Sequence, residues 1–217
     1  GGGGGDAPAS TAPRLQWARY LDFGGTQRDD ALAVTIDNHG DIVVGGIKWL
    51  RSWEAPVGTG VPDSYGALAS YDTAGNQRWV TELNSPSSIN ALVNLGGTVT
   101  LVGLLGPQAL CGTVDRLGVA TTSGLAGGVY PSSVRPRGAG LLIGLGDGSF
   151  IQTIGPCTPI QIGILRQRTR VTGLWVRSDY TLVSGDFGDS QGCNNKAGYA
   201  RKLDAAFNLV WERVYDD

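Results

Sequence analysis

The sequence has little of the chemistry on which most enzymes depend. Its 217 residues include no methionine and a single histidine, His39, which lies in a turn-type sequence at residues 37–41. One histidine in a turn argues against Ser-His-Asp and Cys-His mechanisms, and no Gly-Lys-Ser or Gly-Lys-Thr phosphate loop occurs. The three cysteines and the histidine follow no zinc-binding spacing. We therefore predict a protein that is not an enzyme and that carries no cofactor and no metal ion.

Charge and long apolar runs are also scarce. Only 17% of the residues are charged and the net charge is −2, which argues against a general attraction to nucleic acid or to an anionic membrane. No run of about 18 apolar residues is present, so no segment is expected to span a bilayer. The lack of methionine leads us to expect that an N-terminal piece has been removed or was not included.

Residues 1–14 are expected to be a flexible tether that precedes a single domain at residues 15–217. The tether is built from Gly, Pro, Ala and Ser with almost no apolar side chains, so it cannot bury enough surface to order itself. It resembles the spacer that follows the lipidated cysteine of bacterial lipoproteins, and that cysteine would precede Gly1. Such a lipid anchor, absent here, is the one membrane contact that we expect. The alternatives are an ordinary flexible terminus or an expression remnant.

Glycine is what the sequence has in excess, and part of it belongs to an internal repeat. The 35 glycines exceed the usual ~7% and indicate many tight turns or strand ends. The segments GALASYDTAGNQRW, from Gly66, and GYARKLDAAFNLVW, from Gly198, share Gly, Asp, Asn and Trp at identical spacing. They lie 132 residues apart, which is three steps of 44, a normal length for one four-stranded blade. Each copy predicts a strand, a turn and a strand opened by tryptophan.

A second element recurs between these copies. It is a turn followed by a short β-branched strand that ends in glycine, as in GDIVVGG, GTVTLVG, DGSFIQTIG and DYTLVSG, and each follows another apolar strand. Alternation with a period of two predicts strands rather than helices. We count four units, near residues 30–83, 89–130, 137–170 and 171–215, of which the second and third lack the Asp-to-Trp turn. We therefore predict an all-β fold, a β-propeller of four to five degenerate blades with short antiparallel strands.

The first unit resembles a bacterial β-propeller repeat family whose pattern is Trp, Gly-Gly, Asp, Asp-x-x-Gly and a strand ending in Gly. The matching residues are Trp17, Gly24, Gly25, Asp30, Asp37, Gly40 and Gly45. The match covers residues 15–83 well and 171–215 in part. The resemblance implies a propeller in an extracellular or cell-surface setting, in the bacterial periplasm or at the outer membrane. It does not imply an activity, since propellers host binding modules, scaffolds and enzymes.

One strand is left over in this arrangement. The fourth unit ends in its own Trp strand, so the matching strand at residues 15–21 has no blade, although its Trp17 and Arg19 correspond to Trp211 and Arg213. Three explanations stay open: a partial fifth blade, further repeats, or pairing with another molecule. The last would make the chain a structural subunit that assembles with itself by strand exchange, because an unpaired strand is a template for edge-to-edge pairing.

The cysteines suggest one disulfide. Cys157 and Cys193 are expected in the same type of loop of adjacent units, which favours a Cys157–Cys193 pair and leaves Cys111 over. Cys111–Cys157 is the alternative pair, and three reduced thiols are the other possibility.

Two features suggest binding of a protein or a polysaccharide at the cell surface. An insert at residues 48–65 carries Trp49 and Trp53, whose flat rings suit sugars or a protein partner, unless they cover a blade edge. Arg166, Arg168 and Arg170 would point to one side of a strand and suit an anionic glycan or lipid headgroup, unless they form a solvated face.

We therefore predict an extracytoplasmic, surface-tethered, non-catalytic binding or scaffold module. Besides self-assembly, the alternative is a propeller glycan hydrolase, which would need two carboxylates. The candidates stand at strand starts or turns: Asp29, Asp30, Asp147 and Asp179.

Overall fold

The computed structural model describes residues 17–18, 20–24, 28–50, 64–125, 129–164, 169–186 and 197–215. Within these ranges the regular structure consists of fifteen β-strands and no helix. The described part of the chain accordingly contains no helix that is long and apolar enough to cross a membrane. The predicted all-β fold is confirmed.

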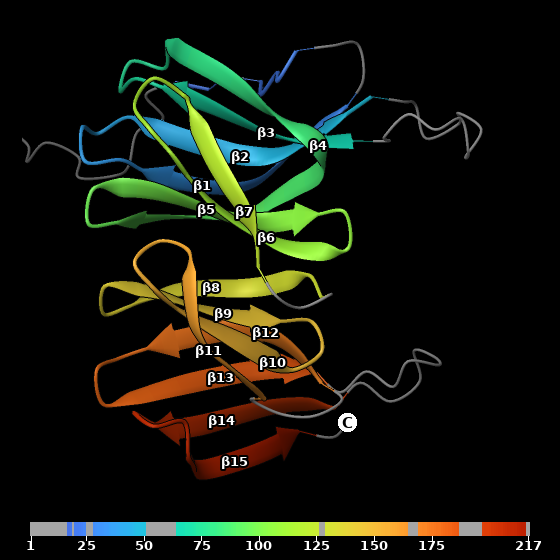
Figure 1. Cartoon of the computed structure of the whole chain (residues 1–217), viewed down its shortest axis with the longest axis vertical. Helices are drawn as coiled ribbons and strands as arrows, with labels where there is room; N and C mark the ends of the chain where they lie inside the picture. The colour runs from blue at the N-terminus through green and yellow to red at the C-terminus, as the bar shows by residue number, and fades with distance from the viewer. Residues whose placement is uncertain are drawn as a thin grey trace, which may run out of the picture.

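The strands form four antiparallel sheets of four strands each, which we call blades A to D, and one long strand is shared by the first two (Figure 1). Blade A contains β1 (Asp29–Ile36), β2 (Ile42–Trp49), β3 (Ser64–Tyr71) and the first part of β4 (Gln77–Leu95). Blade B contains the rest of β4, β5 (Thr98–Leu105), β6 (Gln108–Val114) and β7 (Ala120–Gly124). Blade C contains β8 (Pro131–Arg137), β9 (Gly140–Leu145), β10 (Ser149–Ile154) and β11 (Thr158–Ile164). Blade D contains β12 (Arg170–Val176), β13 (Tyr180–Asp186), β14 (Gly198–Asp204) and β15 (Leu209–Tyr215).

The predicted third unit begins one strand too late. The structure places its first strand at β8, before the predicted start at residue 137, so GAGLLIGL becomes the second strand and DGSFIQTIG the third. The sequence PSSVRPR of β8 combines two prolines with two arginines and shows no apolar alternation. Proline lacks the N–H that a ladder uses, so the sequence pattern gave no signal of a strand here.

The blades stack face to face along the long axis of the molecule, with blade A at one end and blade D at the other (Figure 1). Alternate residues of each strand point to the two neighbouring blades, so each interface has its own apolar core. Leu68, Ile89, Leu101 and Leu110 are buried between blades A and B. Val102, Val134, Leu141 and Ile143 are buried between B and C, and Phe150, Val171, Leu174 and Tyr199 between C and D.

A glycine within the second strand of three blades has a structural reason. In blades A, B and D the first strand bulges where it pairs with the second. Each bulge brings a backbone carbonyl onto the second strand, where a Cβ would lie 1.8 to 1.9 Å from that oxygen. The three glycines and the carbonyls that they face are Gly46 and Asp30, Gly103 and Ser88, and Gly185 and Arg170. Only glycine fits beside these bulges.

An aspartate organises the turn before the fourth strand in blades A, B and D. Asp72, Asp115 and Asp204 each accept hydrogen bonds through Oδ1 from the backbone N–H groups two and four residues later, at 2.8 to 2.9 Å. Hydrogen bonds from the backbone and side chain of Asn76 hold the pKa of Asp72 below its ordinary value. The side chain and backbone of Asn208 lower the pKa of Asp204 in the same way.

These turns are expected to make stability depend on pH in the acid range. Because folding lowers the pKa of Asp204, its stabilising effect is complete above the ordinary pKa of 3.8 and is lost as pH falls through the lowered value. Asp204→Asn is therefore expected to be less stable than the wild type at neutral pH, and the difference should shrink below pH 3.8. Urea denaturation at a series of pH values measures this, with the exposed Asp179→Asn as the control. A difference that stays constant with pH would contradict it.

Different contacts join successive blades. Between A and B, the Trp79 indole Nε1 donates to the Arg116 carbonyl at 2.9 Å, and its ring lies where a Cβ on Gly118 would be. Between C and D, the Arg137 guanidinium donates to the Ala205 carbonyl and lies 4.0 Å over the Phe207 ring. Burial lowers the pKa of Arg137. In both cases the acceptor is the backbone carbonyl of the residue that follows the turn aspartate.

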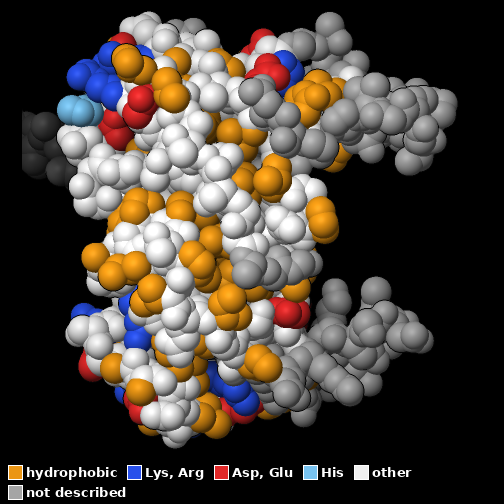
Figure 2. All heavy atoms as spheres, viewed as in Figure 1, with side chains coloured by type: hydrophobic (Ala, Val, Ile, Leu, Met, Phe, Trp, Pro, Cys, Tyr) orange, Lys and Arg blue, Asp and Glu red, His pale blue; other side chains and the backbone are white. Residues whose placement is uncertain are grey.

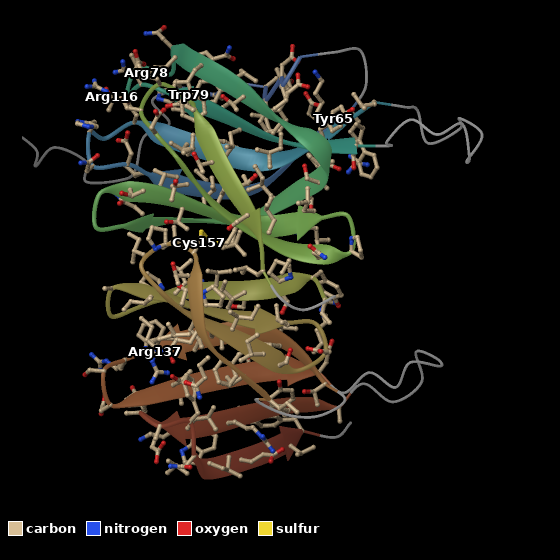
Figure 3. All side chains as sticks on the ribbon, in the orientation of Figure 1. Tyr65, Arg78, Trp79, Arg116, Arg137 and Cys157 are labelled. Carbon is tan, nitrogen blue, oxygen red and sulfur yellow. A yellow bond between two sulfur atoms is a disulfide. The ribbon has the colours of Figure 1, made fainter. Side chains whose placement is uncertain are left out.

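A disulfide joins blades B and C, and it corrects the predicted pairing. Cys111 is bonded to Cys157, with 5.6 Å between their Cα atoms, so Cys157 cannot pair with Cys193, which lies outside the described residues. The alternative pair is thus the one formed. Cys111 lies within β6 and is fully buried, rather than in a loop, and Cys157 lies in the β10–β11 turn that faces it. Figure 3 shows Cys157 between the second and third blades.

Candidate functional site

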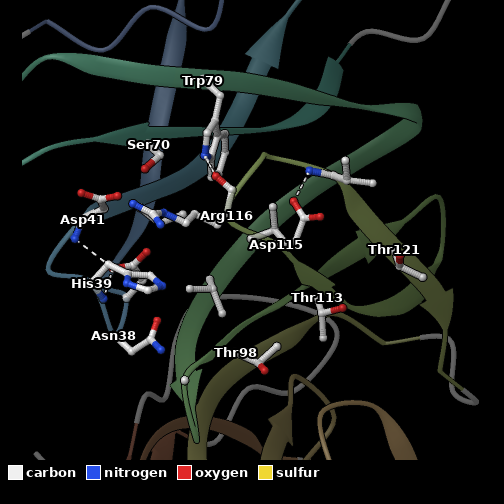
Figure 4. A pocket seen from close by; sticks show the side chains of 16 residues that line it. Asn38, His39, Asp41, Ser70, Trp79, Thr98, Thr113, Asp115, Arg116 and Thr121 are labelled. Carbon is white, nitrogen blue, oxygen red and sulfur yellow. Dashed lines mark hydrogen bonds between the residues drawn. The ribbon is translucent and has the colours of Figure 1, made fainter.

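A pocket of about 360 Å³ lies between blades A and B. Three turns meet there: the β1–β2 turn, the β4–β5 turn and the β6–β7 turn. Its walls include Asn38, His39, Asp41, Trp79, Thr98 and Arg116 (Figure 4). The stacking of the blades therefore brings together side chains that are far apart in the sequence, such as Asn38 and Arg116.

The carboxylates of this pocket are engaged by the protein itself. Asp37 Oδ1 accepts hydrogen bonds from the backbone N–H groups of His39 and Asp41, at 2.8 and 2.9 Å. Asp115 serves its own turn as described above. The buried Asp41 is paired with Arg78, at 2.7 Å between Oδ2 and Nε. These three acids are therefore committed to structure.

The basic groups of the pocket are not engaged in this way. The Arg116 side chain extends from the β6–β7 turn toward Asp41 and His39 (Figure 4). Across the described ranges, no hydrogen bond or ion pair involves the Arg116 guanidinium or the His39 imidazole. Figure 2 shows the histidine beside Lys and Arg side chains at the corner of the molecule that Arg78 and Arg116 occupy in Figure 3. A guanidinium with free donors is suited to bind a carboxylate or phosphate group.

The remaining lining supplies hydroxyl groups and one aromatic edge. Ser70, Thr98, Thr113 and Thr121 contribute hydroxyls, and Trp79 closes one side. Sites of this composition hold small polar ligands, since hydroxyls both donate and accept hydrogen bonds. In the part of the chain that is described, no group of three or more His, Cys, Asp or Glu residues is placed to hold a metal ion.

Trp49 and Arg170, two of the predicted binding residues, lie in different blades. Trp49 ends β2, and its indole Nε1 donates to Asp30 Oδ2 at 2.8 Å. This hydrogen bond and the neighbouring Arg28 hold the pKa of Asp30 below its ordinary value. Arg170 begins β12 in blade D, with its guanidinium 5.6 Å from the Tyr130 ring centroid. The structure does not bring the two together.

The other predicted binding residues, Trp53, Arg166 and Arg168, lie outside the described residues, as does the tether at residues 1–14.

The pocket was not predicted from the sequence, although one signal was present. The Asp-x-x-Gly turn at Asp115–Gly118 repeats the turn at Asp72–Gly75, so it marks the same place in the next blade. The second unit lacks the tryptophan that follows this turn in the first unit, since Thr122 stands in its place. Recognising the turn would have placed Arg116 beside Trp79.

Comparison with known proteins finds a shared architecture and little sequence similarity. No protein-family model and no curated protein matches the chain. Among solved structures, a chain of the mitotic checkpoint complex is similar with a TM-score of 0.58 at 10% identity, over 94% of this chain and 60% of that one. The fold is a β-propeller.

Two further structures agree with this assignment. The Pan2 WD40 domain of Neurospora crassa has a TM-score of 0.52 at 11% identity, over 87% of this chain and 67% of that domain. The dihydro-heme d1 dehydrogenase NirN has a TM-score of 0.50 at 10% identity, over 88% and 48%. The present propeller chain thus spans about half to two thirds of the length of these proteins. Because they include an enzyme, the fold alone does not decide activity.

Proposed function

We propose that this propeller is a non-catalytic binding module that acts outside the cytoplasm and holds a polysaccharide or protein ligand through an acidic group. The observation that carries the proposal is the pocket between blades A and B, whose acids are engaged internally while Arg116 and His39 stay available. A ligand carboxylate would supply the acceptor that the Arg116 guanidinium lacks. The hydroxyl groups and the Trp79 ring beside it favour an acidic sugar as the bound unit.

The disulfide between blades B and C supports the proposed compartment. Disulfides persist in oxidising surroundings such as the periplasm and the cell surface and are rare in the cytosol. The Cys111–Cys157 bond therefore supports an extracytoplasmic location. The lipoprotein-like character of residues 1–14 supports attachment to a membrane surface.

Three of the four candidate carboxylates favour binding over glycan hydrolysis. A hydrolase needs one carboxyl group free to act as an acid and another free to act as a base or nucleophile. Asp29 accepts from the Phe23 backbone N–H, Asp30 from Trp49 and Arg28, and Asp147 from Ser149. These bonds give the three carboxylates structural roles.

Removing the Arg116 side chain is expected to weaken binding of an acidic ligand. The probe is an oligogalacturonide, with the neutral oligosaccharide of equal length for comparison, and binding is measured by isothermal titration calorimetry. Arg116→Ala should reduce affinity for the acidic probe about tenfold or more, because a charge-assisted hydrogen bond is lost. Arg177→Ala, at an exposed turn of blade D, is the matched control.

Two outcomes would contradict the proposal. One is equal binding of the acidic probe to the wild type and to Arg116→Ala. The other is release of shorter oligosaccharides during the titration, since that would show a hydrolase.

A further inference from the structure

The two ends of the blade stack expose apolar faces. On blade A, Leu32, Val34 and Ile36 of β1 are 46%, 64% and 58% exposed. On blade D, Trp175 and Trp211 are 60% and 41% exposed. The corresponding faces between successive blades are buried in the apolar cores described above. Each end therefore presents the kind of surface that elsewhere in the molecule packs against another blade.

A segment outside the four blades covers part of the end of blade A. The Trp17 indole Nε1 donates to the Thr73 carbonyl at 3.0 Å, and the Trp17 ring lies where a Cβ on Gly75 would be. Phe23, which is 2% exposed, packs on Ala67, Ala69 and Tyr71 of β3. Trp17 thus contacts the Asp72 turn of blade A as Trp79 contacts the Asp115 turn of blade B. Residues 17–18 and 20–24 occupy the place that the fourth strand of a preceding blade would take.

The last strand of blade D carries the same sequence pattern as this segment. Leu-x-Trp-x-Arg occurs at residues 15–19 and again at 209–213, within β15. The Trp211 indole, however, makes no hydrogen bond to any described residue. The strand that most resembles the segment on blade A is therefore β15, whose tryptophan has no hydrogen-bonded turn among the described residues.

The turns of the chain limit where Trp211 can bind on a second copy. The Asp115 and Asp204 turns are contacted by Trp79 and Arg137, which belong to adjacent packed blades. The Asp72 turn is contacted by Trp17, which lies outside the four blades. Of these three turns, the Asp72 turn is thus the one at which Trp17 can be replaced by another side chain without separating two blades.

We propose that copies of this chain associate end to end, with blade D of one copy against blade A of the next. In this contact β15 replaces the segment that contains Trp17 and Phe23, and Trp211 donates to the partner's Thr73 carbonyl. The exposed β1 side chains of blade A are then covered by the aromatic face of blade D. The two surfaces differ, so the contact is heterologous, and two copies that close on each other form a ring of eight blades, within the range known for propellers.

Two single variants should change self-association in opposite directions. Trp211→Ala removes the incoming tryptophan and is expected to weaken association at least tenfold, as loss of an aromatic interface anchor does. Trp17→Ala weakens the competing internal contact and is expected to strengthen association. Multi-angle light scattering of the full chain over a concentration series measures both, and circular dichroism checks that each variant is folded. If these tryptophans only stabilised the fold, the two variants would not change self-association in opposite directions.

A mixing experiment tests the end-to-end geometry. Val34→Asp, on the exposed face of blade A, should also prevent association, but it leaves the blade D surface intact. Mixing Val34→Asp with Trp211→Ala should restore a heterodimer, since one intact surface of each kind remains. Ile162→Asp, an exposed aliphatic residue of β11 that is 55% exposed, is the matched control and should behave as wild type.

Three results would overturn the proposal. The first is a wild-type chain and a Trp17→Ala variant that are both monomeric at the highest soluble concentration. The second is a mixture of the two blade variants that stays monomeric, which would indicate a symmetric contact or another partner. The third is equal weakening by Trp17→Ala and Trp211→Ala.

Discussion

Loss of the Cys111–Cys157 disulfide is expected to lower the free energy of unfolding by about 4 kcal/mol. The two cysteines are 46 residues apart, and the bond closes a loop that runs from blade B to the turn after the third strand of blade C. Opening this loop frees the unfolded chain to adopt many more conformations, which favours unfolding. Guanidinium denaturation of the Cys111→Ala/Cys157→Ala double variant measures the loss as a lower midpoint.

Reduction of the wild type is the control for this experiment. A reducing agent opens the bond but leaves the sulfur of the buried Cys111 in place. Its effect therefore measures the loss of the cross-link without the loss of side-chain packing. The reducing agent should lower the midpoint of the wild type and leave the double variant unchanged. An unchanged wild-type midpoint under reduction would show that the bond does not contribute to stability.

Gly103→Ala is expected to destabilise the protein by about 3 kcal/mol or more. The added Cβ would lie 1.8 Å from the Ser88 carbonyl oxygen, and backbone on both strands would have to move to make room. That movement would disturb the bulge of β4 and the core between blades A and B. Thermal and urea denaturation of the variant measure the loss.

Gly106→Ala is the matched control for this prediction. Gly106 has a φ of +57° and no atom within 4 Å of its Cβ position, so its replacement costs only the left-handed backbone conformation, about 1 kcal/mol. The difference between the two variants measures the steric effect of the bulge. Equal losses would mean that the bulge can relax, and that the glycine is not required.

The repeat units were visible in the sequence because their signals are local. Alternation within β1, the glycine pair Gly45–Gly46 in β2, and the Asp-to-Trp turn at residues 72–79 each lie within one blade. Such signals predicted the fold class and the first and fourth units. They missed β8, whose prolines hide the alternation.

The site and the disulfide were not predictable in the same way, since they join different blades. Cys111 reaches Cys157 only because its position within β6 turns its side chain toward blade C. Arg116 reaches the neighbourhood of His39 because blades A and B stack with three turns at one corner. Trp49 looked like a free aromatic platform, but its indole is bonded to Asp30, 19 positions earlier on the paired strand. Periodicity within one strand contains no information on these contacts.

The contacts that join the blades also bear on how a repetitive chain avoids misassembly. Repeat proteins fail characteristically by exchanging equivalent elements, because similar blades offer similar surfaces. Here each boundary has a different chemistry: an indole on a carbonyl, a covalent sulfur bridge, and a guanidinium over an aromatic ring. A blade that meets the wrong neighbour loses the contact of its own boundary, although the carbonyl after the turn aspartate is an acceptor in blades A, B and D alike. The order A to D is therefore favoured by specificity as well as by connection. The end of blade A is the exception. Its Asp72 turn accepts the indole of Trp17, and in the proposed contact it accepts that of Trp211 instead.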